Sequence, residues 1–319
     1  WAFQDKPREK VFLLARELGC TSQDPDTVLD FLMTVPAIDL MTAQHKENIV
    51  TAKEKAHKFS LIFTPCVEVA GETPFLPDTP RKLMENGDFA KVPIILGIND
   101  KEGMLALAHQ AVPNHDNFSL FVPHDLAITP DSEEERRLGQ EILQFYAKTE
   151  TFSWDVVSQY IDFITDVDFA ISLEYSRRCF LKHGVSVYTY LFTYTSPRTF
   201  SSFLIPMSYP DKAEQFLGCG ASHGDELIFL FKTNMSKLPF LPPTVEDQSM
   251  MDKLVKTWTT FAKTGNPNCD ELGVTWTSDD NHNPQYLEIG KIWKQVNGVL
   301  FPERMEFWRN IYDKHSFLY

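Results

Sequence analysis

Residues 92 to 103, VPIILGINDKEG, join an unbroken apolar run to a polar turn. The apolar part, Val92 to Ile98, has the length of a β-strand and no polar alternation, which is typical of a parallel strand buried on both faces. The turn that follows contains Glu102. Catalytic groups of open α/β sheets gather just past the carboxyl ends of such strands, so the pattern predicts a buried parallel strand and a candidate acid.

Further strands and helices alternate along the rest of the chain. β-Branched and aromatic residues predict a second strand at 185 to 195, and a short third strand is expected at 285 to 290. Helices are expected at 6 to 19, 24 to 35, 38 to 45, 131 to 148, 245 to 265 and 302 to 315, with a proline- and serine-rich loop at 196 to 214. The alternation predicts one α/β fold with helices flanking the sheet.

Charge and composition restrict the possible partners. The chain has 319 residues and a formal net charge of −14. Because a basic surface is missing, neither nucleic acid nor an anionic membrane is expected as a partner. No apolar run reaches the roughly 18 residues that a membrane span needs. The expected ligand is a neutral or cationic small molecule.

Other features leave the compartment open between cytoplasmic and secreted. The chain opens at Trp1 without a leader pattern, so a processed or truncated beginning is expected. The sequons at Asn117 and Asn234 permit a secretory route, because N-x-[ST] is the acceptor for glycosylation. The five cysteines are scattered and contain no C-x-x-C pair, and we expect no metal and no other cofactor.

Residues 218 to 231, GCGASHGDELIFLF, contain a G-x-S-x-G match centred on Ser222. In a nucleophile elbow a strand turns sharply into a helix, and the serine lies at that turn. The residues before this match are charged and lack the apolar run of a central strand. Beyond the neighbouring His223, only His282 and His315 follow as partners for such a serine. We therefore interpret Ser222 as a chance match.

His223 is the better catalytic candidate in this stretch. Three nearby glycines allow the unusual backbone angles that hold an imidazole in place, and an apolar helix is expected to follow directly. The alternative is a structural or solvated histidine. Glu102 has an alternative interpretation as a solvated carboxylate in a turn. For Asp225 and Glu226 the alternative is that they stabilise the start of the following helix by offsetting its dipole.

Several separate motifs resemble, in order and across essentially the whole chain, the C-terminal three-fifths of the type-B carboxylesterase/cholinesterase family. They are the F-x-P-x-V-E run at 63 to 68, FLPDTP at 75 to 80, VPIILGINDKEG, SHGDELIFLF, WTTFAKTGNPN at 258 to 268 and the tryptophan spacing around Trp276. The start of the chain, FVPHDLA at 121 to 127 and FAKTGNPN are most similar to insect α-type carboxylesterases. The resemblance implies an α/β-hydrolase fold, with residues 1–319 as the C-terminal portion of a single domain.

The resemblance also implies roles for individual residues. Glu102 matches the family's triad acid, and His223 matches its base. Trp1 falls where the family places a tryptophan that lines the acyl pocket, which implies a substrate contact. Asp225 and Glu226 would support the base loop. The nucleophilic serine and the H-G-G oxyanion loop would lie before the point where this chain begins, so these residues alone are not expected to hydrolyse esters.

The activity implied is hydrolysis of carboxylic esters by a Ser-Glu-His triad through an acyl-enzyme. A phenylalanine-rich composition favours small-molecule esters with apolar groups. For an insect α-type enzyme, the resemblance implies dietary or xenobiotic substrates, a part in detoxification and insecticide resistance, and organophosphates as covalent inhibitors.

Two alternatives stay open at this point. A catalytically inactive, cholinesterase-like adhesion protein would keep the fold, although the presence of Glu102 and His223 argues against it. A hormone- or pheromone-specific esterase would share the chemistry and differ in the shape of its pocket. The sequence does not distinguish the physiological ester or the oligomeric state.

Overall fold

The computed structural model describes residues 3–4, 6–44, 46, 63–69, 72–109, 117–216, 218–232 and 241–315. Trp1, the predicted substrate contact, lies outside the described residues. The second sequon, at Asn234, lies outside them as well.

The described residues form a four-stranded sheet in the order β1-β2-β3-β4. Its strands are β1 (Ile94–Asn99), β2 (Val187–Phe192), β3 (Gln285–Ile289) and β4 (Trp293–Asn297). The first three strands run parallel to their neighbours, and β4 pairs antiparallel with β3. The three predicted strands and the mostly parallel sheet are confirmed. β4 was not predicted, because its sequence WKQVN is largely polar.

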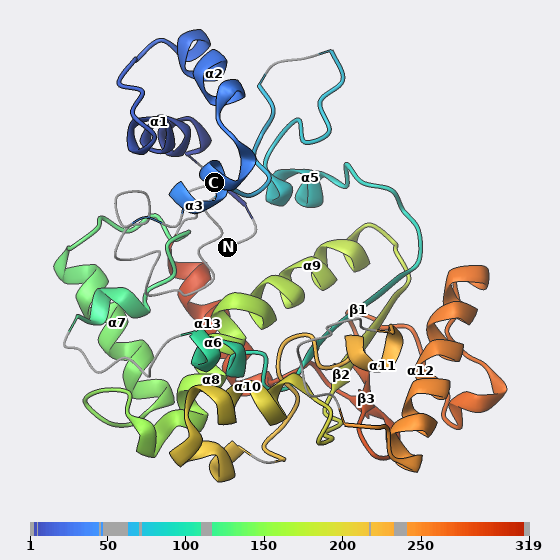
Figure 1. Ribbon diagram of the computed structural model, residues 1–319. Helices are drawn as coiled ribbons and strands as arrows, with labels where there is room; N and C mark the ends of the chain where they lie inside the picture. The colour runs from blue at the N-terminus through green and yellow to red at the C-terminus, as the bar shows by residue number, and fades with distance from the viewer. Residues whose placement is uncertain are drawn as a thin grey trace.

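Helices pack on both faces of this sheet (Figure 1). In chain order they are α1 (Pro7–Glu17), α2 (Pro25–Thr34), α3 (Ala37–Ala43), α5 (Pro80–Asn86), α6 (Met104–His109), α7 (Glu133–Tyr146), α8 (Val157–Thr165), α9 (Ile171–Lys182), α10 (Phe200–Ser208), α11 (Leu227–Leu230), α12 (Val245–Thr264) and α13 (Pro302–Lys314). Figure 1 places the strands between α9 on one side and α11 and α12 on the other, while α1 to α3 lie apart from the sheet. The helix layers confirm the predicted α/β class.

The alternation of side chains along β2 explains why both faces are covered. Tyr188 and Phe192 join an aromatic cluster under α11 and α12, which also contains Trp276. Leu191 points the other way, into the larger core formed with α7, α8 and α13. Successive strand residues face opposite sides of a sheet, so one apolar strand serves two cores.

The predicted loop at 196 to 214 is wrong. Most of this segment is helical, as α10 followed by a 3-10 helix at Pro210–Phe216. The composition predicts a loop because proline inside a helix removes one N–H donor. Here α10 packs against α6, and the backbone N–H of Phe200 donates to the Asp225 carboxylate. These tertiary contacts override the local composition.

The parallel register brings the carboxyl ends of β1 and β2 together. Asn99 lies opposite Phe192, and the next residue, Asp100, donates its backbone N–H to the Phe192 carbonyl oxygen at 3.0 Å. The turn that contains Glu102 therefore starts from the same edge as the chain leaving β2. That edge positions the candidate site.

Gly97 offers a test of the β1–β2 packing. A Cβ atom at this position would lie 2.3 Å from Cδ1 of Tyr190, and Cγ of the same ring lies 2.4 Å away. The G97A variant should therefore lower the free energy of unfolding by roughly 1–3 kcal/mol, because overpacking forces the strand or the ring to move. Denaturant unfolding of the full-length protein measures it, and the cost should shrink when G97A is combined with Y190V. An unchanged unfolding midpoint in G97A contradicts this packing.

Candidate active site

Glu102 is held in a buried position just after β1. Only 5% of the Glu102 surface is exposed to solvent. One carboxylate oxygen, Oε1, accepts the backbone N–H of Asn99 at 2.8 Å. On the far side, the backbone N–H of Gly103 donates to Thr165 Oγ1 at 3.0 Å. A Cβ at Gly103 would lie 2.3 Å from the Ile161 carbonyl oxygen, so the turn fits against α8 only with glycine here. Glu102 is therefore not the solvated turn acid of the alternative interpretation.

His223 lies on a loop at 218 to 226 that reaches the same edge of the sheet. Its Nδ1 atom is 2.7 Å from Glu102 Oε2. The His223 side chain stays 42% exposed while that of Glu102 is 6% exposed. The two residues are far apart in the sequence, and the fold brings them together in the geometry of a base oriented by an acid. Their catalytic roles remain predictions.

Polar side chains from β1 and the base loop hold this arrangement. Asn99 donates through Nδ2 to the Ser222 carbonyl oxygen at 2.6 Å and to Glu226 Oε2 at 2.5 Å. Asp225 is fully buried and accepts from the backbone N–H of Ser222 at 2.7 Å. Asp225 and Glu226 thus both hydrogen-bond to residues of this arrangement, and their supporting role stays a prediction.

Ser222 does not sit in a nucleophile elbow. The described residues leading to it form the 3-10 helix Pro210–Phe216 and a turn, where an elbow requires a strand. Ser222 itself is buried, with 2% of its surface exposed. This geometry agrees with the interpretation of the G-x-S-x-G match as a coincidence.

An aromatic ring lies beside the imidazole. The Phe169 and His223 ring centroids are 4.9 Å apart, with 35° between the ring planes. Phe169 belongs to a π-helical turn, Asp166–Ala170, between α8 and α9. Such turns occur frequently at functional sites. The sequence held no local signal for this contact, because it depends on where a distant helix packs.

Electrostatics favour the protonated imidazole. Burial lowers the pKa of His223, but the hydrogen bond and charge of Glu102, with the charges of Glu226 and Asp225, outweigh burial and raise it above 6.5. Burial also raises the pKa of Asp225 to about 7, against its hydrogen bonds from Ser222 and Phe200. The site thus stabilises an imidazolium, which is the form that a general base acquires during reaction.

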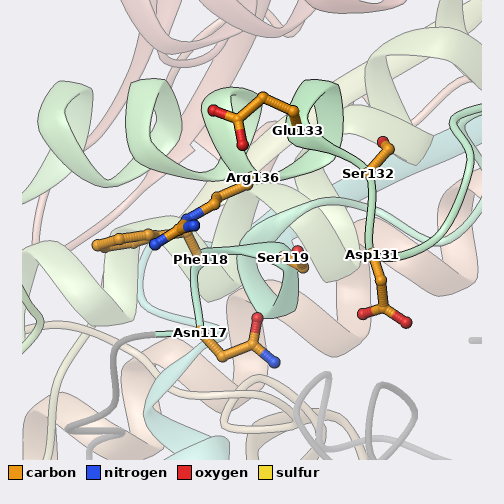
Figure 2. Close-up of a pocket in the computed structure, with 7 residues that line it drawn as sticks. All are labelled: Asn117, Phe118, Ser119, Asp131, Ser132, Glu133 and Arg136. Atoms are coloured by element: carbon orange, nitrogen blue, oxygen red, sulfur yellow. The ribbon is translucent and has the colours of Figure 1, made fainter.

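Within the described residues, no group of three His, Cys, Asp or Glu side chains could hold a metal ion. A hollow of about 450 Å³ lies elsewhere, between the segment at Asn117 and the start of α7. Figure 2 shows residues that line it, with Arg136 and Glu133 on the helix, Asn117 across from them and the Phe118 ring next to Arg136. Neither Glu102 nor His223 lines this hollow.

Comparison with known proteins identifies the fold of the chain and then its family. The crystal structure of juvenile hormone esterase from Manduca sexta, with OTFP covalently attached, superposes with a TM-score of 0.73 at 20% identity and covers 98% of this chain and 57% of that one. The fold is accordingly that of an α/β-hydrolase. Residues 1–308 match the carboxylesterase family, and the chain belongs to that family.

Curated relatives include insect esterases at modest identity. Esterase FE4 of Myzus persicae is 25% identical over 304 residues, which cover 92% of this chain and 50% of that protein. Venom carboxylesterase-6 of Apis mellifera is 25% identical over 331 residues, which cover 98% of this chain and 55% of that protein. The chain thus spans about half the length of the curated relatives it matches. No helix among the described residues is long and apolar enough to cross a membrane.

The His223–Glu102 pair predicts a measurable pKa change. In E102Q the carboxylate charge is lost, so the pKa of His223 should fall below its raised value, and the neutral base form should dominate from a lower pH. NMR titration of the His223 ring protons in the full-length protein measures this shift. E174Q is the matched control, because Glu174 pairs with Arg177, and it should leave the His223 titration unchanged. Identical titrations in E102Q and wild type would falsify the pairing.

Proposed function

We propose that the protein hydrolyses carboxylic esters with a Ser-Glu-His triad, in which Glu102 is the acid and His223 the base. The observation that carries this proposal is the 2.7 Å contact between His223 Nδ1 and Glu102 Oε2 at the carboxyl edge of the sheet. Membership of the carboxylesterase family supports the reaction class. No cofactor is needed for this chemistry.

The reaction proceeds in two proton-balanced steps. His223 Nε2 takes the proton of the serine hydroxyl while the serine oxygen attacks the ester carbonyl, and it returns that proton to the departing alcohol. In the second step His223 takes a proton from a water molecule that attacks the acyl-enzyme carbonyl, and it gives this proton to the serine oxygen as the bond to the acyl group breaks and the acid leaves. Glu102 fixes the tautomer through Nδ1 and stabilises the imidazolium formed in each step. An oxyanion hole outside residues 1–319 would stabilise the tetrahedral intermediates.

Residues 1–319 would form the C-terminal portion of a single α/β-hydrolase domain, with the nucleophilic serine in the rest of the protein. Two features support this division. The chain spans about half the length of its relatives. In addition, β1 lies at the edge of the described sheet although its sequence is apolar, and only its last two residues, Ile98 and Asn99, are buried. An edge strand presents unpaired backbone N–H and C=O groups, with which a further strand would pair.

The substrates would be small-molecule esters with apolar acyl or alcohol groups. Phe169 supplies an apolar surface next to the imidazole, and the net charge of −14 disfavours anionic substrates. The relatives named above include esterase FE4 of Myzus persicae and venom carboxylesterase-6 of Apis mellifera. On this basis we propose dietary or xenobiotic esters, a part in detoxification, and inhibition by organophosphates that phosphorylate the serine.

Kinetics of two neighbouring variants test the assignment of the base. H223A should lower kcat of the full-length protein on a nitrophenyl ester by about a thousandfold or more, because a triad works as a unit. S222A alters the adjacent residue and should keep kcat within about twofold of wild type, which makes it the matched control. A large loss in S222A with activity retained in H223A would reverse the assignment.

Covalent labelling tests the proposed nucleophile and separates the enzyme from an inactive adhesion protein. A fluorophosphonate probe should label one serine of the full-length protein, and mass spectrometry should place that serine outside residues 1–319. H223A should slow the labelling, because the serine loses its base. Absence of labelling in the folded wild-type protein supports the adhesion alternative and contradicts the proposed function.

A further inference from the structure

Residues 99 to 102, the acid loop, contact the base loop at residues 218 to 226. The hydrogen bonds between them involve Ala221 and Ser222, the two residues before His223. The backbone N–H of Ala221 donates to Asp100 Oδ1 at 2.7 Å, and the Ala221 carbonyl oxygen accepts the backbone N–H of Lys101 at 2.9 Å. At the next residue, the Ser222 carbonyl oxygen accepts from Asn99 Nδ2 at 2.6 Å. Three consecutive residues of one loop therefore bind two consecutive residues of the other.

Gly220 permits this close approach. Its φ is +139°, and a Cβ there would lie 2.4 Å from Lys101 Cγ and 2.8 Å from Asp100 Oδ2. The two loops thus meet where only a glycine fits, with the Asp100 carboxylate at the centre of the contact.

The Asp100 side chain has no role in the chemistry proposed above, yet it accepts a backbone hydrogen bond at the centre of this contact. Burial raises the pKa of its carboxyl to about 6, against the Ala221 N–H and the charge of Lys101. Lys101 is itself held by Asp162 of α8, with 2.7 Å between Nζ and Oδ1. The partly buried Asp100 carboxylate accepts a backbone N–H two residues before His223. This contact can hold His223 in position.

We propose that Asp100 is a positioning residue for catalysis: by binding the Ala221 N–H it fixes the base loop to the acid loop, so that His223 and Glu102 keep their contact through the reaction. This inference rests on the proposed function. It predicts that the loss of Asp100 acts mainly on the chemical step, because misplacing a catalytic group by about 1 Å can cost a hundredfold in rate.

The test compares variants at Asp100 in the full-length protein. D100A should lower kcat tenfold or more with KM within about twofold of wild type. D100N should restore most of kcat, because its amide oxygen can still accept the Ala221 N–H. D100E keeps the charge but displaces the acceptor by one methylene, so it should lower kcat as well, and it carries the test if D100A does not fold.

D247A is the matched control. Asp247 is also buried and accepts a backbone N–H, that of Thr244 at 2.8 Å, but it caps α12 and touches neither loop. It should change stability without the selective loss in kcat.

A spectroscopic readout separates positioning from a general loss of stability. The proton between His223 Nδ1 and Glu102 should give a low-field NMR resonance in wild type, which D100A should broaden or shift while D247A leaves it in place. If D100A and D100E both keep kcat within twofold and the resonance unchanged, the positioning role is overturned while the esterase function stands. If wild type lacks esterase activity, the proposed function fails, and the resonance alone still decides whether Asp100 holds the pair together.

Discussion

The parallel pairing of β1 with β2 is the constraint on which the site depends. Its register sets Asn99 opposite Phe192, and the pairing continues one residue further through the Asp100 backbone. Because both strands end at this edge, the acid follows directly from one strand and the base loop returns to the same place after α10. The 2.7 Å contact between Glu102 and His223 follows from that register.

Burial and exposure are divided between Glu102 and His223 in a way that suits the proton transfer proposed for them. Glu102 is buried and accepts a hydrogen bond from the Asn99 N–H, whereas the His223 side chain is partly exposed to solvent. The buried carboxyl groups near the imidazole favour its charged form. The Phe169 ring lies beside the imidazole, with 4.9 Å between the two ring centroids. An oriented and partly shielded imidazole of this kind needs little reorganisation when charge develops.

Much of the sheet could be predicted from the sequence, because β1 and β2 are apolar runs of strand length. Glu102 could be selected as a candidate from its place after β1 and His223 from its nearby glycines, whereas the roles predicted for both came from the family resemblance. Local sequence patterns do not encode tertiary packing. For this reason the sequence did not predict the contact of His223 with Phe169 or the hydrogen bond from Ala221 to Asp100, and it did not show that Glu102 and His223 are in contact. The same limit explains the errors at α10, where a proline- and serine-rich composition suggested a loop, and at β4, whose polar residues pair only because β3 is adjacent.

A crystal structure of the full-length protein after reaction with a fluorophosphonate tests the central claim most directly. The account predicts a phosphonylated serine from outside residues 1–319, within hydrogen-bond distance of His223 Nε2, with Glu102 still bound to Nδ1. A phosphonyl group on Ser222, or on a serine remote from His223, would contradict it.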